Sequence, residues 1–111
     1  MKIYISGKIT GLDKQDYIEA FKKVQENLES LGHKVMNPAS SMDTCSEGFN
    51  QNDYLHICYA MIDVCDAIYM LGNWQSSQGA RKELQYASDW RKQIIYQDKK
   101  TIEAGFPVVH G

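Results

Sequence analysis

The chain has 111 residues, 43% of them hydrophobic and 23% charged, which fits one globular domain and argues against a disordered or fibrous chain. No apolar run approaches the ~20 residues that span a bilayer, and no segment resembles a signal peptide, so we expect a cytoplasmic protein without a membrane partner. A formal net charge of −2 gives no general attraction for a nucleic-acid polymer, so a nucleotide ligand should be small and held in a pocket.

The cysteines and histidines indicate no metal site. The cysteines are Cys45, Cys58 and Cys65, and the histidines lie far apart in the sequence, so no zinc-binding spacing occurs. We therefore expect neither a metal nor a cofactor, and free thiols fit a reducing cytoplasm.

The first part of the chain predicts a strand, a helix and a second strand. The nearly continuous apolar run Lys2–Ser6 is typical of a strand buried on both faces. Asp13 can cap a helix that ends at Gly32 and whose apolar residues recur at spacings of four and three. These residues are Tyr17, Phe21, Val24, Leu28 and Leu31. Lys34–Asn37 then predicts the second strand, which Pro38 stops.

The rest of the chain continues this alternation. Residues 39–51 are polar and predict a loop, whose length is typical of a functional segment. The next helix should bury one apolar face, made of Tyr54, Ile57, Cys58, Met61, Ile62 and Cys65. We then expect a strand at Ala67–Leu71, a turn at Gly72–Gln78, a helix from about Gly79 to Trp90 and a strand at Gln93–Tyr96. The last dozen residues predict either an edge strand or a tail.

This order of elements predicts an α/β fold, a flavodoxin-like or Rossmann-like three-layer sandwich with a parallel sheet of four to five strands. Residues 1–111 would form a single domain. Such sheets bind ligands beyond the carboxyl ends of their strands. That rule selects three loops, Ser6–Gly11, Asn37–Cys45 and Gly72–Gly79.

The first of these loops has the sequence SGKITG. Its two glycines allow the backbone to approach a ligand closely and Lys8 adds a positive charge, although an ordinary strand-to-helix turn has a similar composition. Tyr4 in the preceding strand either points its phenol toward the site or packs in the core. The candidate binding residues here are Ser6, Gly7, Lys8, Ile9 and Gly11, together with Asn37 after the second strand.

The third loop opens a helix whose amino end can attract an anion. Ser77 supplies a hydroxyl there and Gly79 a free amide. Glu83 follows Gly79 by about one helical turn, and the small Ala80 leaves room for a ligand. In the alternative interpretation Ser77 is a plain N-cap and Glu83 an exposed glutamate. Trp74 either lines the pocket or covers the edge of the sheet.

Two blocks, IYISGKITG near the start and CDAIYMLGNWQSSQGARKELQYA later, resemble the nucleoside 2-deoxyribosyltransferase superfamily, which includes the 2'-deoxynucleoside 5'-phosphate N-hydrolases. The chain is most similar to small uncharacterised bacterial and phage members, which share a V-x-N-P segment after the second strand and G-x-W-x-x-S-x-G-A after the third. The resemblance covers nearly all of the chain up to Tyr96.

The resemblance implies N-glycosidic chemistry in which Glu83 is the nucleophile that attacks the anomeric carbon of deoxyribose and expels the base. Ser77 falls where the phosphohydrolase branch holds the 5'-phosphate and the transferase branch has an aspartate. With Gly79 and Lys8, a serine favours a phosphate over a free hydroxyl. We therefore expect a nucleoside monophosphate as the small-molecule partner, and we take Glu83 and Tyr4 as the candidate catalytic residues.

Two positions depart from the family's pattern. Cys58 lies eight residues before Asp66, where the family usually has a second carboxylate, and a thiol of ordinary pKa, near ~8.5, does not replace it at neutral pH. Thr10 stands where the phosphohydrolases have an arginine. The hypotheses are therefore an enzyme that cleaves the N-glycosidic bond of a 2'-deoxynucleoside 5'-monophosphate, or a non-catalytic nucleotide-binding or sensing module. A degenerate scaffold without a ligand is the third.

The resemblance also implies a homodimer or a dimer-based oligomer in which a neighbouring subunit completes each site. The aromatic-rich segments Gln51–Tyr59 and Tyr86–Trp90 are the expected contact surfaces.

Overall fold

Strands and helices alternate along the chain in the computed structural model, which describes residues 1–40 and 45–98. The elements are β1 (Lys2–Ser6), α1 (Lys14–Ser30), β2 (Lys34–Met36), α2 (Gln51–Asp63), β3 (Ala67–Met70), a 3₁₀ turn (Trp74–Ser76), α3 (Gln78–Asp89) and β4 (Gln93–Tyr96). These bounds confirm the four predicted strands and three predicted helices. The edge strand or tail expected in the last dozen residues lies outside the described residues. None of the helices in the described ranges is both long and apolar enough to cross a membrane.

The four strands form one parallel sheet in the order β2-β1-β3-β4. This order confirms the α/β sandwich of flavodoxin-like or Rossmann-like type. The chain moves from β1 outward to β2 on one side, and β3 and β4 then extend the sheet on the other side. The strand order therefore reverses between β1 and β3, which is where open α/β sheets bind ligands beyond their carboxyl ends.

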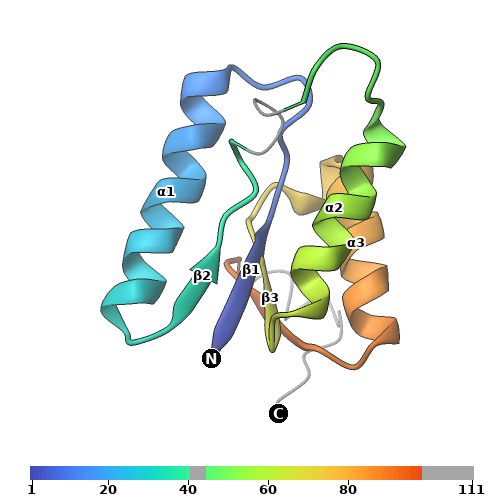
Figure 1. The fold of residues 1–111 in the computed structure, drawn as a ribbon. Helices are drawn as coiled ribbons and strands as arrows, with labels where there is room; N and C mark the ends of the chain where they lie inside the picture. Colours follow the sequence, from blue (N-terminus) through green and yellow to red (C-terminus); the bar gives the residue numbers. More distant parts are fainter. Residues whose placement is uncertain (41–44, 99–111) are drawn as a thin grey trace.

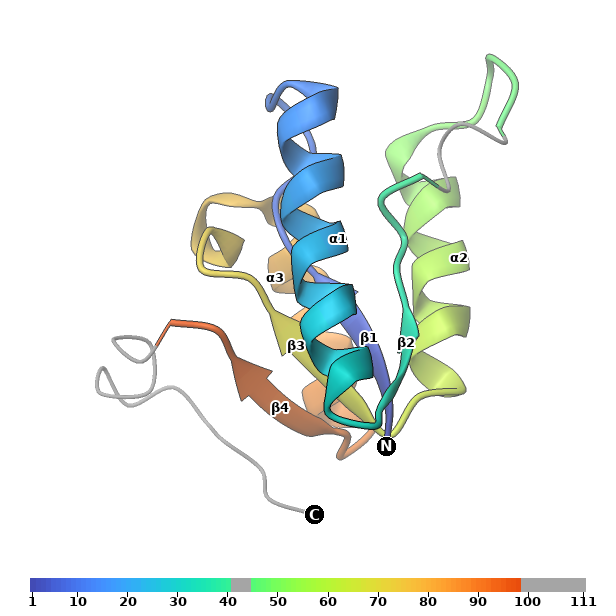
Figure 2. The ribbon, with the colours of Figure 1, turned by 90° about the vertical axis from the view of Figure 1, so that its left-hand side faces the viewer.

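Helices cover both faces of the sheet, with α1 on one side and α2 and α3 on the other (Figures 1 and 2). Successive side chains of a strand point to opposite faces. Ile3 and Ile5 of β1 accordingly pack in the core on the α1 side, whereas Tyr4 packs among residues of α2 and α3. Ser6, two residues after Tyr4, faces the α2–α3 side as well, and this alternation brings Ser6 toward the start of α3.

Short polar side chains fix the amino ends of the helices. Asp13 caps α1 by accepting a hydrogen bond from the backbone N–H of Gln15, as the sequence predicts. Asn50 and Asp53 form a reciprocal capping box at the start of α2. Ser77 caps α3. The helices that begin at the edge of the sheet where the strands end therefore have fixed starts.

Two apolar residues that the sequence assigned to buried helix faces lie at the surface instead. Leu31 is 67% exposed because α1 ends at Ser30 and Leu31 forms its C-cap. Ile57 is 42% exposed on α2, next to the buried Cys58. The helical spacing was right for the central part of α1, where Phe21, Val24 and Leu28 are buried, and wrong at these two positions.

Candidate active site

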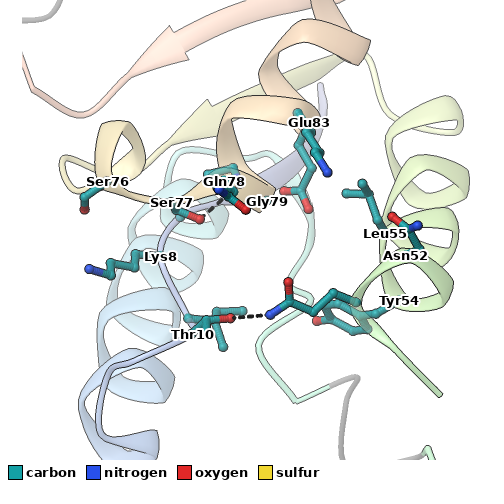
Figure 3. A pocket seen from close by; sticks show the side chains of 15 residues that line it. Lys8, Thr10, Asn52, Tyr54, Leu55, Ser76, Ser77, Gln78, Gly79 and Glu83 are labelled. Atoms are coloured by element: carbon teal, nitrogen blue, oxygen red, sulfur yellow. Dashed lines mark hydrogen bonds between the residues drawn. The ribbon is translucent and has the colours of Figure 1, made fainter. Parts of the chain in front are cut away.

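A cavity of about 400 Å³ lies beyond the carboxyl ends of β1 and β3, where the strand order reverses. Small-molecule sites typically have volumes of roughly 300–1,000 Å³. Three segments line the cavity, namely the loop after β1, the first turns of α2 and the start of α3 (Figure 3). The lining residues are Gly7, Lys8, Ile9, Thr10, Gln51, Asn52, Tyr54, Leu55, Ser76, Ser77, Gln78, Gly79, Ala80, Lys82 and Glu83.

Glu83 is a buried carboxylate in the wall of this cavity. Its side chain is only 8% exposed, and the Ser6 hydroxyl donates a hydrogen bond of 2.7 Å to its Oε1 atom. Ala80 and Ala87, on the same face of α3, are buried and small, so α3 packs closely on the sheet. Glu83 therefore faces the cavity beside the Ser6–Gly11 loop, and the alternative interpretation of an exposed glutamate is wrong.

Burial controls the ionisation of Glu83. It raises the pKa of the carboxyl group to about 7, and the side chains of Ser6, Tyr4 and Cys58 act in the opposite direction. A carboxyl group with that pKa exists in both protonation states near neutral pH. Glu83 can therefore act as a nucleophile when it is ionised and can hold a proton when it is not.

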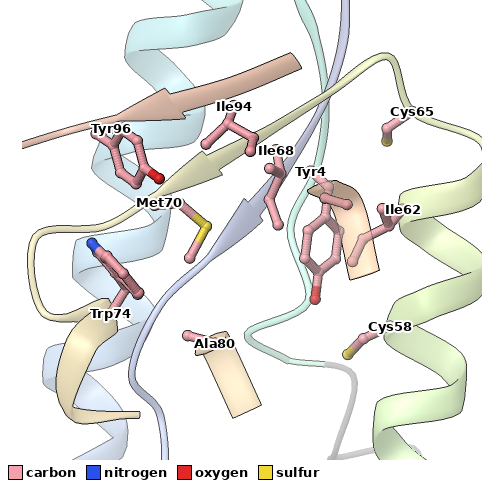
Figure 4. Close-up of a cluster of buried hydrophobic side chains, with 11 residues drawn as sticks. Tyr4, Cys58, Ile62, Cys65, Ile68, Met70, Trp74, Ala80, Ile94 and Tyr96 are labelled. Carbon is pink, nitrogen blue, oxygen red and sulfur yellow. The ribbon is translucent and has the colours of Figure 1, made fainter. Parts of the chain in front are cut away.

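Tyr4 and Cys58 are neutral groups beside Glu83. Both are buried, and in Figure 4 the Tyr4 ring extends from β1 toward α2, where Cys58 lies. Burial and the neighbouring carboxylate of Glu83 raise the pKa of Tyr4 well above its usual value and that of Cys58 to about 12. Both groups therefore stay protonated at neutral pH.

The start of α3 and the loop after β1 form the end of the cavity that suits an anion. The Ser77 hydroxyl accepts a hydrogen bond of 3.1 Å from the backbone N–H of Ala80 and can still donate its own proton. A Cβ added at Gly79 would only reach ordinary van der Waals contact with the Ser77 hydroxyl, at 3.9 Å, so this turn is not crowded. Lys8 lies opposite, where its backbone N–H donates to Asn73 at 3.0 Å. A helix amino end next to a lysine attracts negative charge.

The first turns of α2 form the other end of the cavity, which the sequence interpretation missed. The Gln51 carboxamide reaches across to Thr10, with 3.5 Å between Gln51 Nε2 and Thr10 Oγ1. The Tyr54 hydroxyl donates to the carbonyl of Pro38 at 2.6 Å and anchors this turn to the segment after β2. The available signal was topological, because a helix that follows a strand begins at the same edge of the sheet at which that strand ends.

Most predicted site residues meet at this cavity. Ser6, Gly7, Lys8, Ile9, Ser77, Gly79, Ala80 and Glu83 either line it or bond directly to a residue that does. Gly7 also allows close packing, because an added Cβ would lie 2.5 Å from the Leu71 side chain.

Besides Ser6, three other predicted binding residues lie outside the lining. Asn37 donates from its side chain to Gln25 and accepts from the backbone N–H of Ala39, so it holds the turn after β2. Gly11 has a φ of 86° in the turn before α1. Trp74 is 4% exposed and packs near Tyr96 with 5.9 Å between ring centroids, so of its two predicted roles it covers the sheet. Of the second predicted loop, residues 41–44 lie outside the described residues.

Glu83 is the only carboxylate in the cavity lining given by the described residues. Asp53 accepts a hydrogen bond from the Asn50 backbone in the capping box of α2. Asp63 accepts one from the Tyr86 hydroxyl and is exposed. Neither replaces the carboxylate that the resemblance expects at Cys58. Across the described ranges, no three His, Cys, Asp or Glu side chains gather in a way that could hold a metal ion.

The chain belongs to the family described as a domain of unknown function (DUF4406), whose model matches residues 1–96. The matched region contains all the strands and helices found in the described residues, together with the whole cavity lining. No curated protein matches the chain. The family description assigns no activity, so the case for a function rests on the chemistry of the cavity.

Proposed function

We propose that this protein cleaves the N-glycosidic bond of a 2'-deoxynucleoside 5'-monophosphate, by hydrolysis or by deoxyribosyl transfer, as a relative of the nucleoside 2-deoxyribosyltransferases. The observation that carries this proposal is the Glu83 carboxylate, which is buried, lines the cavity and is oriented by the Ser6 hydroxyl at 2.7 Å. A carboxylate held in this way can attack the anomeric carbon of a sugar in the cavity.

The reaction has two steps at the sugar C1' atom. An oxygen of ionised Glu83 forms a bond to C1' while the bond from C1' to the base nitrogen breaks, and its electron pair leaves with the base, which takes a proton from water. Water then attacks C1', the ester bond to Glu83 breaks, and its electron pair returns to the carboxylate. The attacking water releases a proton that balances the one taken by the base. In the transfer reaction a second base takes the place of this water.

The other end of the cavity supports a phosphate as part of the substrate. Ser77, Gly79 and Lys8 all line the cavity. Ser77 offers its hydroxyl and Lys8 adds a positive charge at this end. A phosphate dianion gains charge-assisted hydrogen bonds from such donors and is favoured at a helix amino end. Ser77 caps the amino end of α3, and Glu83 is the sixth residue of that helix. With the phosphate at Ser77 and C1' at Glu83, the sugar would lie between the phosphate and the base.

The proposed activity can be tested by incubating the protein with each of the four common deoxynucleoside 5'-monophosphates and measuring free base by chromatography. We expect base release from at least one of them, and no release by Glu83→Gln, which keeps the shape of the side chain but loses its charge. Absence of release from every monophosphate, in the presence of measurable binding, would contradict the enzymatic proposal.

A second candidate function is a non-catalytic nucleotide-binding or sensing module. The observation that favours it is Cys58, a neutral thiol with a pKa raised to about 12 by burial, at the position where related enzymes carry a carboxylate. Without a second carboxylate the departing base receives no proton from that position. Tight monophosphate binding that is equal in the wild type and in Cys58→Asp, with no base release from either, would favour this module.

The homodimer and the cytoplasmic location are also proposals. The rings of Tyr59 and Tyr86 stack at 4.2 Å, and the neighbouring Trp90 is 64% exposed, so α2 and α3 present an aromatic surface that a second copy could cover. A reducing compartment such as the cytoplasm would keep Cys45, Cys58 and Cys65 as the free thiols found in this structure.

A further inference from the structure

Apart from Lys82 and Glu83 of α3, which also line the cavity, its two ends differ in charge. Lys8 and the amino end of α3 lie on one side, with Ser77, and the four lining residues from α2 lie on the other (Figure 3). Those four residues, Gln51, Asn52, Tyr54 and Leu55, carry no charge at neutral pH. A ligand that fits both ends has an anionic group at one end and a neutral polar group with an apolar face at the other.

Under the proposed function, the order of groups along the cavity indicates which part of the substrate lies at the neutral end. Figure 3 shows Glu83 between Ser77 on one side and Leu55 with Asn52 on the other. With the phosphate at Ser77 and the anomeric carbon at Glu83, the substituent on that carbon must extend toward α2. That substituent is the base.

We infer that the first turns of α2 form the base-binding subsite, in which the carboxamides of Asn52 and Gln51 bind the edge of the base and Leu55 contacts its face. A carboxamide offers two donor hydrogens and an acceptor oxygen, which match the neutral edges of nucleobases without placing a charge against them. This assignment rests on the proposed function and goes beyond it, because it names the residues that set the preference for one base.

The local structure leaves these two carboxamides available. The Asn52 side chain makes no hydrogen bond to any residue in the described ranges, and Gln51 holds Thr10 only at 3.5 Å, the long end of hydrogen-bond distances. The backbone that carries them is fixed by the capping box of Asn50 and Asp53 and by the Tyr54 hydroxyl on Pro38. A bound base can therefore exchange the Gln51–Thr10 contact for its own hydrogen bonds without unwinding α2.

The test uses calorimetric titration of the four deoxynucleoside 5'-monophosphates and of 2-deoxyribose 5-phosphate, which has no base. Glu83→Gln serves as the parent so that no ligand is consumed, and Asn52→Ala, Gln51→Ala and Asn27→Ala are added to it. Asn27 is an exposed asparagine of α1 outside the cavity and provides the matched control. We expect Asn52→Ala to weaken the preferred monophosphate about fivefold to tenfold, the value of one hydrogen bond, and to leave 2-deoxyribose 5-phosphate unchanged. Asn27→Ala should change neither ligand.

The outcomes separate this inference from the proposed function. If the parent binds all four monophosphates equally, or if the variants at Asn52 and Gln51 keep the full preference of the parent, the base subsite is not at α2 and the inference is wrong. If the parent binds neither the monophosphates nor 2-deoxyribose 5-phosphate, the proposed function fails and the inference fails with it. Equal weakening of 2-deoxyribose 5-phosphate by Asn52→Ala would show a general disturbance of the cavity and would also overturn the assignment.

Discussion

The Ser6 hydroxyl donates a hydrogen bond of 2.7 Å to Oε1 of Glu83 and so joins two buried side chains that lie 77 positions apart in the sequence. Ser6 ends β1 and Glu83 lies on α3, so this bond connects the sheet to the helix at the cavity wall. It stabilises the ionised form of a carboxyl group whose pKa burial raises to about 7. The proposed chemistry of the site depends on this buried, oriented carboxylate.

Base release should depend on the ionisation of Glu83. The nucleophile is the ionised form, so the single-turnover rate should rise between about pH 6 and 8, around the pKa of about 7, and level off above it. Ser6→Ala removes a donor to the carboxylate and should move the midpoint to higher pH. Rates measured by rapid quench across this range test both expectations. A rate that falls as the pH rises, or a midpoint unchanged in Ser6→Ala, would contradict them.

The same ionisation should cost stability. Burial raises the carboxyl pKa of Glu83 to about 7 in the folded chain, against an ordinary value of 4.5. The folded state therefore binds more protons between these values, and stability falls as the pH rises through them. Glu83→Gln stays neutral and avoids this loss. Its free energy of unfolding relative to wild type should therefore improve by on the order of 2–3 kcal/mol between about pH 5 and pH 8.

Urea unfolding at the two pH values measures this difference. Glu26→Gln, which removes an exposed glutamate of α1, is the control and should show no comparable change. If the free energies of unfolding of Glu83→Gln and wild type differ by the same amount at both pH values, ionisation of Glu83 does not destabilise the folded protein, and the expectation is wrong.

The sequence was sufficient for the fold because its local signals agree with the final structure. The apolar runs at Lys2–Ser6 and Gln93–Tyr96 predicted the bounds of β1 and β4, and Asp13 predicted the start of α1. Errors arose where a helical pattern continued past the end of its helix, as at Leu31. They also arose where an apolar residue next to a buried one was assigned to the same face, as at Ile57 beside Cys58.

The candidate site was only partly predictable for a physical reason. Topology places the loops and helix starts that follow the strands at one edge of the sheet. This rule located Ser77 and Glu83. Topology also places the start of α2 at this edge. Whether α2 reaches the cavity depends on how closely it packs against α3, and no spacing in the sequence encodes this distance. Trp74 had two equally good interpretations, and packing against Tyr96 decided between them.

The phosphate end of the cavity can be tested at Ser77. Aspartate is as good an N-cap as serine, so Ser77→Asp should leave α3 intact while its negative charge opposes a phosphate. We expect the affinity for a deoxynucleoside 5'-monophosphate to fall by about one to two decades, or roughly 1–3 kcal/mol, and that for the matching nucleoside to change little. Calorimetric titration measures both. Equal loss for the two ligands would contradict a phosphate at this position.

The proposed dimer can be tested at Trp90, which is exposed beside the stacked rings of Tyr59 and Tyr86. We expect the wild type to have the mass of a dimer by light scattering and Trp90→Asp to shift toward the monomer, because a charge in an apolar interface is costly. Leu31→Asp makes the same kind of change at the exposed leucine that forms the C-cap of α1 and should leave the mass unchanged. A wild-type protein that is monomeric at every concentration would rule out this interface.

The most direct test of the central claim is the mass of the intact protein after acid quench during incubation with a deoxynucleoside 5'-monophosphate. The account predicts an increase by one 5-phospho-2-deoxyribosyl group, which peptide mapping locates on Glu83 and which is absent from Glu83→Gln. Base release without any adduct on Glu83, or an adduct on another residue, would contradict the assignment of Glu83 as the nucleophile.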